Sequence, residues 1–181
     1  MITTTKYNQT TISKKVSLDG VGLHTGKDVT LTFHPSDSNT GYVFKRIDLE
    51  GEPIVEADIN YVTNTERGTC LNKNNVVIQT CEHVLASLVG LQIDNALIEL
   101  NASEPPIMDG SSKYFVEALE KAGIKQLNDK RKEFVVKNVI SFKDQDSGSE
   151  ITVIPSKEYQ VTTMVDFGTK ILGTQNASIS S

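Results

Sequence analysis

The sequence has little of what metal, disulfide or nucleic-acid proteins use most. Its 181 residues include two cysteines and three histidines, and 18 Lys and Arg are outweighed by 23 Asp and Glu, giving a formal net charge of −5. Because phosphate binding depends on clustered Lys and Arg, and the longest basic run is residues 130–132 (KRK), we expect no nucleic-acid partner. Cys70 and Cys81 form no CxxC or CxxH pattern, which argues against a disulfide framework or a zinc finger. We therefore expect two free, buried thiols.

Long apolar runs are also absent. The longest, residues 84–93, is too short and too interrupted to span a bilayer, and the first ten residues are polar. We expect no membrane span and a cytoplasmic location.

The first half of the chain has the pattern of strands. Apolar and polar residues alternate over residues 11–18, 29–33 and 42–47, with glycine and proline between the runs. This spacing predicts antiparallel hairpins. Residues 69–71 and 76–78, which flank an Asn-rich turn, predict a further hairpin.

The hydrophobic period then changes to that of a helix. A helix is predicted from about Cys81, with Thr80 as its N-cap and one apolar face; a strand follows over residues 95–100. A second helix is predicted with Asp109 as its cap and Gly123 as its end. The predicted apolar faces consist of Val84, Leu85, Leu88, Val89 and Leu91 in the first helix and Phe115, Val116, Leu119 and Ala122 in the second. Residues 1–128 are thus expected to form an α+β domain, a two-layer sandwich of a β-sheet against two helices.

Residues 129–181 are predicted as a charged linker (129–133) followed by strands over 134–142, 150–154 and 160–167. Residues 29–36 (VTLTFHPS) can be aligned with residues 150–156 (EITVIPS), and both runs lead to a similar later strand end. An internal repeat explains this similarity, although a strand and turn with Pro-Ser can also recur by chance. If the repeat is real, the second copy stops before its helices.

Glu82 and His83 are the first candidates for chemistry. They begin the first predicted helix, so both side chains can approach one pocket at its amino end. A neutral imidazole is a good Zn²⁺ ligand, and an adjacent carboxylate could accept a proton from water on the metal. The dipeptide alone also fits an ordinary hydrogen-bonded histidine and a glutamate stabilised by the helix dipole, and no HExxH pattern is present.

The other candidates have simpler interpretations. His24 lies in a glycine-dense connection that permits close backbone approach but lacks the helix of a phosphate loop. His34, before Pro35, is expected to be structural or exposed. Asp109 fits a helix cap or, alternatively, an active-site wall, and residues 61–69 fit a solvated polar loop or a substrate contact.

Four motifs together resemble the UDP-3-O-acyl-N-acetylglucosamine deacetylases, the zinc amidases of lipid A biosynthesis in Gram-negative bacteria. The order and spacing match over most of residues 12–128. The motifs are residues 20–26 (GVGLHTG), 80–88 (TCEHVLASL), 94–101 (DNALIELN) and 106–111 (PIMDGS). The resemblance implies two similar α+β domains, each a sheet layered against two helices.

The resemblance also assigns roles. It implies Zn²⁺ as cofactor, His83 as a zinc ligand, and Glu82 as the general base that takes a proton from zinc-activated water attacking the acetamide of UDP-3-O-acyl-N-acetylglucosamine, so that acetate is released. The family's other ligands, a histidine and an aspartate, lie late in its second domain, together with an assisting lysine and histidine. Some members are fused to a hydroxyacyl-carrier-protein dehydratase.

No histidine follows His83, so the family's remaining ligands have no counterpart in these residues. We therefore expect the chain to be the N-terminal portion of such an enzyme, with the first strands of a second domain in residues 129–181, and to be inactive by itself. The alternative is a non-catalytic α+β binding module that retains the fold.

Overall fold

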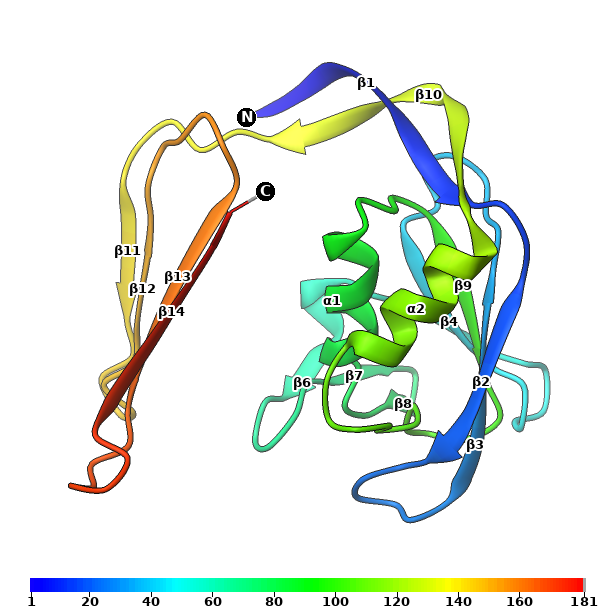
Figure 1. Ribbon diagram of the computed structural model, residues 1–181, viewed down its shortest axis with the longest axis horizontal. Helices are drawn as coiled ribbons and strands as arrows, with labels where there is room; N and C mark the ends of the chain where they lie inside the picture. The colour runs from blue at the N-terminus through cyan, green and yellow to red at the C-terminus, as the bar shows by residue number, and fades with distance from the viewer. Residues whose placement is uncertain (181) are drawn as a thin grey trace. The chain divides into compact units, whose positions relative to one another are not determined.

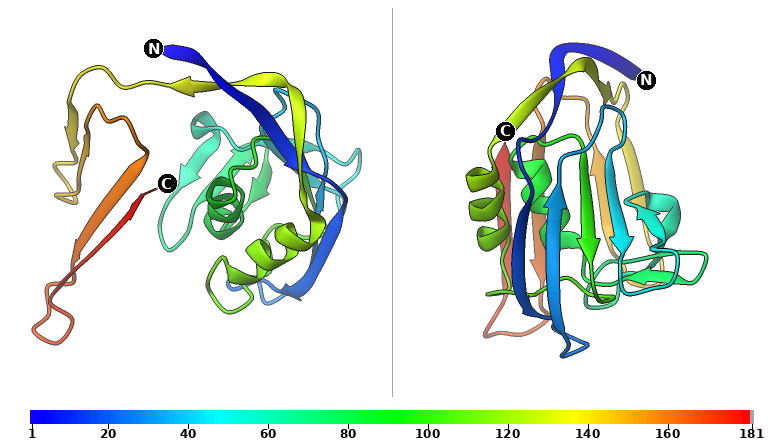
Figure 2. Two further views of the ribbon diagram at one scale, coloured as in Figure 1. Left: turned by 45° about the horizontal axis from the view of Figure 1, so that its top comes forward. Right: turned by 90° about the vertical axis from the view of Figure 1, so that its right-hand side faces the viewer.

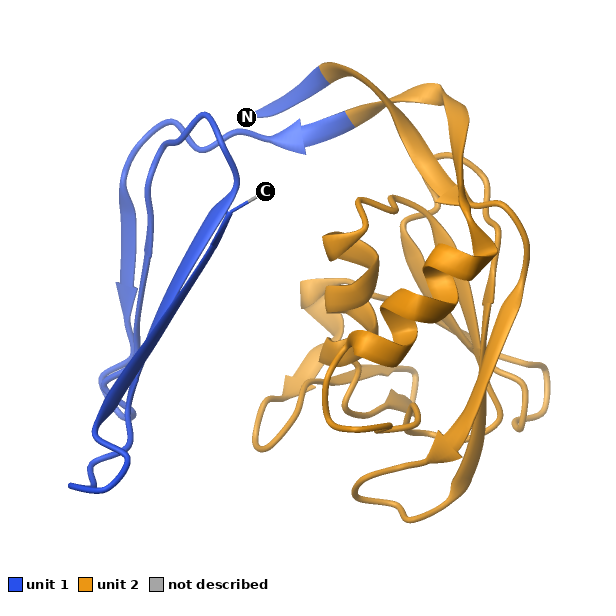
Figure 3. Ribbon diagram, viewed as in Figure 1, with its two compact units in different colours: residues 1–4, 132–181 blue, residues 5–131 orange. Residues whose placement is uncertain are grey.

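A computed structural model describes residues 1–180 of the chain, which divides into two compact units (Figure 3). The larger unit contains residues 5–131. The smaller unit joins residues 1–4 to the chain from residue 132 onward. Each unit is described by itself below.

The larger unit is built on a five-stranded sheet in the order β2-β3-β9-β4-β5. Neighbouring strands are antiparallel, except that β4 and β9 run parallel. The strands are β2 (Val16–Val21), β3 (Asp28–His34), β4 (Tyr42–Arg46), β5 (Ile54–Glu56) and β9 (Ala96–Leu100).

The position of β9 corrects the prediction that three successive strands form hairpins. β2 and β3 do form one, but β9 lies between β3 and β4. Ala96, Ile98 and Leu100 of β9 are fully buried, so this strand suits the centre of the sheet. Burial of the apolar strand β9 at the centre of the sheet is therefore favoured over direct pairing of β3 with β4, which are neighbours in the sequence.

A long strand pair corrects two further predictions. Residues 13–15 separate β1 (Ile2–Ile12) from β2, so residues 11–18 are not one strand. β1 pairs with β10 (Ile124–Phe134), so residues 129–133, where the two units meet along the chain, form part of a strand and are not an irregular segment. A partner strand supplies the backbone hydrogen bonds that a charged segment would otherwise make with water.

A small sheet contains the predicted hairpin. It consists of β6 (Val62–Asn64), β7 (Cys70–Lys73) and β8 (Val76–Ile78), preceded by a 3-10 turn at Ile59–Tyr61. β7 and β8 pair in antiparallel register, with Leu71 opposite Ile78, so this prediction is confirmed.

Both predicted helices form, and they lie on the same face of the five-stranded sheet (Figure 1). They are α1 (Glu82–Gly90) and α2 (Lys113–Ala122). Period-two alternation in β3 buries Leu31 and Phe33 on this face, and the ring of Phe115 meets Phe33 edge-on with 6.4 Å between centroids. Figure 2 shows the sheet and the two helices from two further directions.

α1 begins at Glu82, as predicted, and Gly123 ends α2 with φ +74°, but both predicted caps are wrong. Thr80 is not the cap of α1, because its hydroxyl donates to Glu104 and the cap position belongs to Cys81. Asp109 is not the cap of α2, because its carboxylate binds Ser111 in a tight turn before the cap residue Ser112. Val89 is 50% exposed and does not belong to the buried face.

The smaller unit contains two hairpins, β11 (Ile140–Lys143) with β12 (Glu150–Val153), and β13 (Gln160–Asp166) with β14 (Thr174–Ser180). The predicted strand over 134–142 is therefore interrupted between β10 and β11, and β14 was not predicted.

The β11–β12 hairpin repeats a detail of β2–β3. Ser141 lies opposite Thr152 with 2.9 Å between the hydroxyls, as Ser17 lies opposite Thr32 with 2.8 Å. Thr32 and Thr152 are also the residues that correspond when residues 29–36 are aligned with residues 150–156, as the sequence suggested.

These elements confirm the α+β class. Among the residues that the structure describes, no helix has the length and apolar character needed to cross a membrane.

Candidate active site

The structure brings three of the four sequence motifs together at the amino ends of the two helices. Ile107 donates its N–H to the carbonyl of Val21 over 3.0 Å, which attaches the PIMDGS segment to the glycine-dense loop. Ser112, directly after that segment, donates its hydroxyl to the carbonyl of His83 over 2.9 Å. Motifs separated by up to 90 residues thus converge beside Glu82 and His83.

Glu82 is the first residue of α1 and is half-buried. Its Oε2 accepts the backbone N–H of Thr69 over 2.9 Å. Gly68 lies beside the other oxygen, and a Cβ built on it would be 3.4 Å from Oε1. The carboxylate is therefore held at a fixed position by the end of the 61–69 loop, which corrects the interpretation of that loop as merely solvated.

His83 follows in the first turn of α1 and is also half-buried. Its backbone carbonyl is fixed by Ser112, whereas its imidazole makes no hydrogen bond or ion pair with any residue in the described range 1–180.

These donors fit a metal ion only in part. A histidine with uncommitted ring nitrogens beside a fixed carboxylate suits a Zn²⁺ ligand and a neighbouring base. Within residues 1–180, however, no group of three or more His, Cys, Asp or Glu side chains lies close enough to hold an ion. His83 would therefore supply one ligand of a set that these residues do not complete.

Glu104 is a site residue that the sequence analysis missed. It is 0% exposed, and its carboxylate accepts N–H groups from His24 and Thr25 and the hydroxyl of Thr80. Burial acts to raise the pKa of Glu104, but the hydrogen bonds from Thr25, His24 and Thr80 outweigh it and the pKa is lowered. The available signal was a single carboxylate directly before Pro105-Pro106 in a stretch of small and apolar residues.

One glycine of the glycine-dense loop, Gly22, lies against this carboxylate. A Cβ on Gly22 would lie 2.6 Å from Oε2 of Glu104 and 2.3 Å from the hydroxyl of Thr25, so only glycine fits there. The exposed imidazole of His24 reaches the carbonyl of Arg67, 3.4 Å from Nε2. The loop is thereby placed next to the segment that binds Glu82.

Comparison with known proteins decides the family. The family model for UDP-3-O-acyl N-acetylglycosamine deacetylase matches residues 9–181. The chain belongs to this deacetylase family.

Curated relatives agree with the family model. One is the bifunctional enzyme LpxC/FabZ of Bacteroides thetaiotaomicron, 42% identical over 171 residues that cover 94% of this chain and 37% of the relative. Another is the UDP-3-O-acyl-N-acetylglucosamine deacetylase of Geotalea uraniireducens, 40% identical over 167 residues that cover 92% of this chain and 54% of the relative. The chain thus spans between about a third and about half of the length of these relatives.

The other candidates in this deacetylase-family chain make contacts of their own. Nε2 of His34 lies 2.7 Å from Oε2 of Glu99, a structural contact as expected. The two thiols are free; Cys81 is buried and donates to the carbonyl of Thr69, while Cys70 is only half-buried. Asp109 is exposed and binds only Ser111 in its turn.

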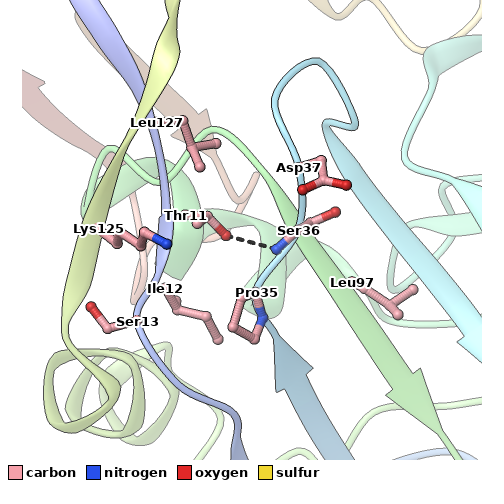
Figure 4. A pocket seen from close by; sticks show the side chains of 9 residues that line it. All are labelled: Thr11, Ile12, Ser13, Pro35, Ser36, Asp37, Leu97, Lys125 and Leu127. Atoms are coloured by element: carbon pink, nitrogen blue, oxygen red, sulfur yellow. Dashed lines mark hydrogen bonds between the residues drawn. The ribbon is translucent and has the colours of Figure 1, made fainter.

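A pocket in the larger unit of the deacetylase-family chain is unrelated to this chemistry. Neither Glu82 nor His83 lines it. Within it, the N–H of Ser36 donates a hydrogen bond to the hydroxyl of Thr11 (Figure 4). It is lined by Thr11, Ile12, Ser13, Pro35, Ser36, Asp37, Leu97, Lys125 and Leu127.

Proposed function

We propose that this chain carries part of the active site of a zinc-dependent enzyme that deacetylates UDP-3-O-acyl-N-acetylglucosamine in lipid A biosynthesis. Glu82 is the general base and His83 is a zinc ligand. The proposal is supported by family membership and, above all, by the side chain of Glu82, which the N–H of Thr69 holds. The imidazole of the next residue, His83, has no hydrogen-bond or ion-pair partner among residues 1–180.

The residues present suit amide hydrolysis. Oε2 of Glu82 is anchored by Thr69, which orients the carboxylate to accept a proton from a water molecule attacking the acetamide carbonyl. Zinc, when bound, would supply Lewis-acid activation and stabilise negative charge on the carbonyl oxygen. The water oxygen bonds to the carbonyl carbon and the carbon–nitrogen bond breaks; acetate leaves, and the nitrogen gains one proton derived from the water to become the free amine of the sugar.

We further propose that the remaining zinc ligands come from residues outside 1–180. The segment from residue 129 would open a second domain of the same two-layer architecture as residues 1–128. Support comes from the β11–β12 hairpin, whose Ser-Thr pair repeats that of β2–β3.

We also propose that the full protein carries a fused dehydratase domain. Relatives in Bacteroides thetaiotaomicron, Chlorobaculum tepidum and Porphyromonas gingivalis are each named bifunctional enzyme LpxC/FabZ, and these residues are about 40% identical to them. The cytoplasmic location stays a prediction.

The decisive experiment is acetate release from UDP-3-O-acyl-N-acetylglucosamine by the full protein as the cell makes it. Glu82→Gln should lower kcat by about a hundredfold to ten-thousandfold while zinc content is retained, because the base is lost but the ligand is kept. His83→Ala should lose both zinc and turnover. Glu117→Gln on α2 is the matched carboxylate control and should behave as wild type.

Unchanged turnover in Glu82→Gln and His83→Ala would overturn both assignments. If the wild-type protein binds the UDP-sugar without releasing acetate, the non-catalytic binding module becomes the better description.

A further inference from the structure

Glu104 is a fully buried carboxylate to which the proposed reaction gives no part. It lies after β9, in the short connection that leads to Pro105-Pro106. A buried charge is costly unless several polar groups stabilise it, so its presence calls for a physical reason.

Its partners come from two segments distant in sequence. The N–H of His24 lies 3.1 Å from Oε1 and 3.0 Å from Oε2, and the N–H of Thr25 lies 2.9 Å from Oε2. The hydroxyl of Thr80 lies 2.9 Å from Oε1. Among the described residues no Lys or Arg pairs with this carboxylate, so backbone and hydroxyl donors alone stabilise its charge.

Both segments lead to Glu82. Thr80 stands two residues before it and has φ +50°, an uncommon backbone conformation for a β-branched residue that its bond to Glu104 helps to hold. The imidazole of His24 reaches the carbonyl of Arg67, and Thr69, two residues further on, donates its N–H to the carboxylate of Glu82.

We propose that Glu104 is a positioning residue for the deacetylation. Its carboxylate connects the glycine-dense loop to Thr80. The backbone before α1 and the 61–69 loop are thereby fixed, and together they hold Glu82 in the orientation that accepts a proton. This role rests on the proposed function, because it assigns an effect on the reaction of Glu82.

The first test measures turnover of the full protein. Glu104→Ala should lower kcat by about tenfold to a hundredfold with little change in KM and no loss of zinc, since the base is misoriented but remains in place. Glu104→Gln should recover most of the loss. Its carbonyl can accept the two N–H groups, and its amide can donate to the hydroxyl of Thr80, which then acts as acceptor.

Thr80 supplies a matched pair. Thr80→Ser keeps the hydroxyl and should retain kcat, whereas the isosteric Thr80→Val removes it and should lower kcat in the same direction as Glu104→Ala. Val55→Ala, at a fully buried position in β5, is the control for destabilisation without loss of the site, and its kcat per folded molecule should equal that of wild type.

A spectroscopic readout is independent of turnover. In the 181-residue chain, the amide proton resonances of His24 and Thr25 should move upfield in Glu104→Ala and stay in place in Val55→Ala, because only the former loses the carboxylate acceptor. Unmoved resonances would overturn the contacts on which the proposal depends.

The two proposals fail differently. A wild-type protein without turnover would overturn the proposed function. Wild-type turnover with an unchanged kcat in Glu104→Ala, despite shifted amide resonances, would overturn the positioning role alone.

Discussion

The backbone of Gly22 passes so close to Glu104 that a Cβ atom on it would lie 2.6 Å from the carboxylate oxygen Oε2. Gly22→Ala should therefore force the loop away from Glu104 and lower the free energy of unfolding by about 1–3 kcal/mol. Gly90→Ala is the matched control, because no heavy atom lies within 4 Å of its would-be Cβ at the end of α1. That variant should be neutral or slightly stabilised, by up to about 1 kcal/mol. Urea unfolding compares the two; equal effects would contradict the close approach.

The pH dependence of stability should carry the signature of Glu104. Its pKa is lowered in the folded chain by the N–H and hydroxyl donors, against the opposing effect of burial, so folding favours the deprotonated form. The stabilisation is fully present when the pH is above the ordinary pKa of glutamate. It is lost as the pH falls through the lower pKa that Glu104 has in the folded chain. The free energy of unfolding of the wild type should exceed that of Glu104→Gln by about 2 kcal/mol near neutral pH. This difference should become smaller as the pH is lowered. A gap that stays constant on acidification would contradict this assignment.

The two thiols should differ in reactivity. Burial first, and then the charge of Glu82, raise the pKa of Cys81 to about 12, so its thiolate is scarce at neutral pH. Iodoacetamide should label the half-buried Cys70 faster in the folded chain, and both residues equally after denaturation. Mass spectrometry of the labelled peptides distinguishes them. Faster labelling of Cys81 in the folded state would contradict its burial.

The two units should differ in hydrogen exchange. Leu31 and Phe33 of β3 are 0% exposed, whereas Ile151 of β12 and Phe142 of β11 are 65% and 67% exposed. Strands without a buried face open more easily, so the amides of β11–β14 should exchange faster than those of β3 and β9. Equal protection of both sets in the 181-residue chain would show that another surface covers the hairpins.

Zinc binding by the isolated 181 residues should be weak. Within residues 1–180 no three potential ligands lie together, and a single imidazole gives little affinity. Metal analysis after dialysis should find well below one zinc per chain. Tight equimolar zinc that His83→Ala removes would contradict this and imply ligands supplied by a second chain.

Local sequence signals were sufficient where one face or one end of an element decides the structure. The apolar period placed both helices, and Gly123 ended α2 because its φ of +74° suits glycine. The Asn-rich turn gave the β7–β8 hairpin. The predicted helix caps were wrong, because Thr80 and Asp109 use their side chains on Glu104 and Ser111 instead of on the helix.

The site was predicted only in outline. Glu82 and His83 were named from a motif, and the structure adds that Thr69 binds the carboxylate of Glu82 while the imidazole of His83 lacks a partner in the described range. Glu104 was missed because a carboxylate becomes a buried anchor only when segments about 80 and 24 residues away supply its donors.

By itself the sequence determined the α+β class, the two helices, the family motifs and the candidate pair Glu82-His83, since periodicity and motif spacing are written along the chain. Tertiary structure alone decided that β9 enters between β3 and β4, that the charged segment before Phe134 pairs with β1, and that Glu104 joins His24 to Thr80. Each of these depends on pairing or burial between residues far apart in sequence, where the gain from packing and hydrogen bonding outweighs local preference.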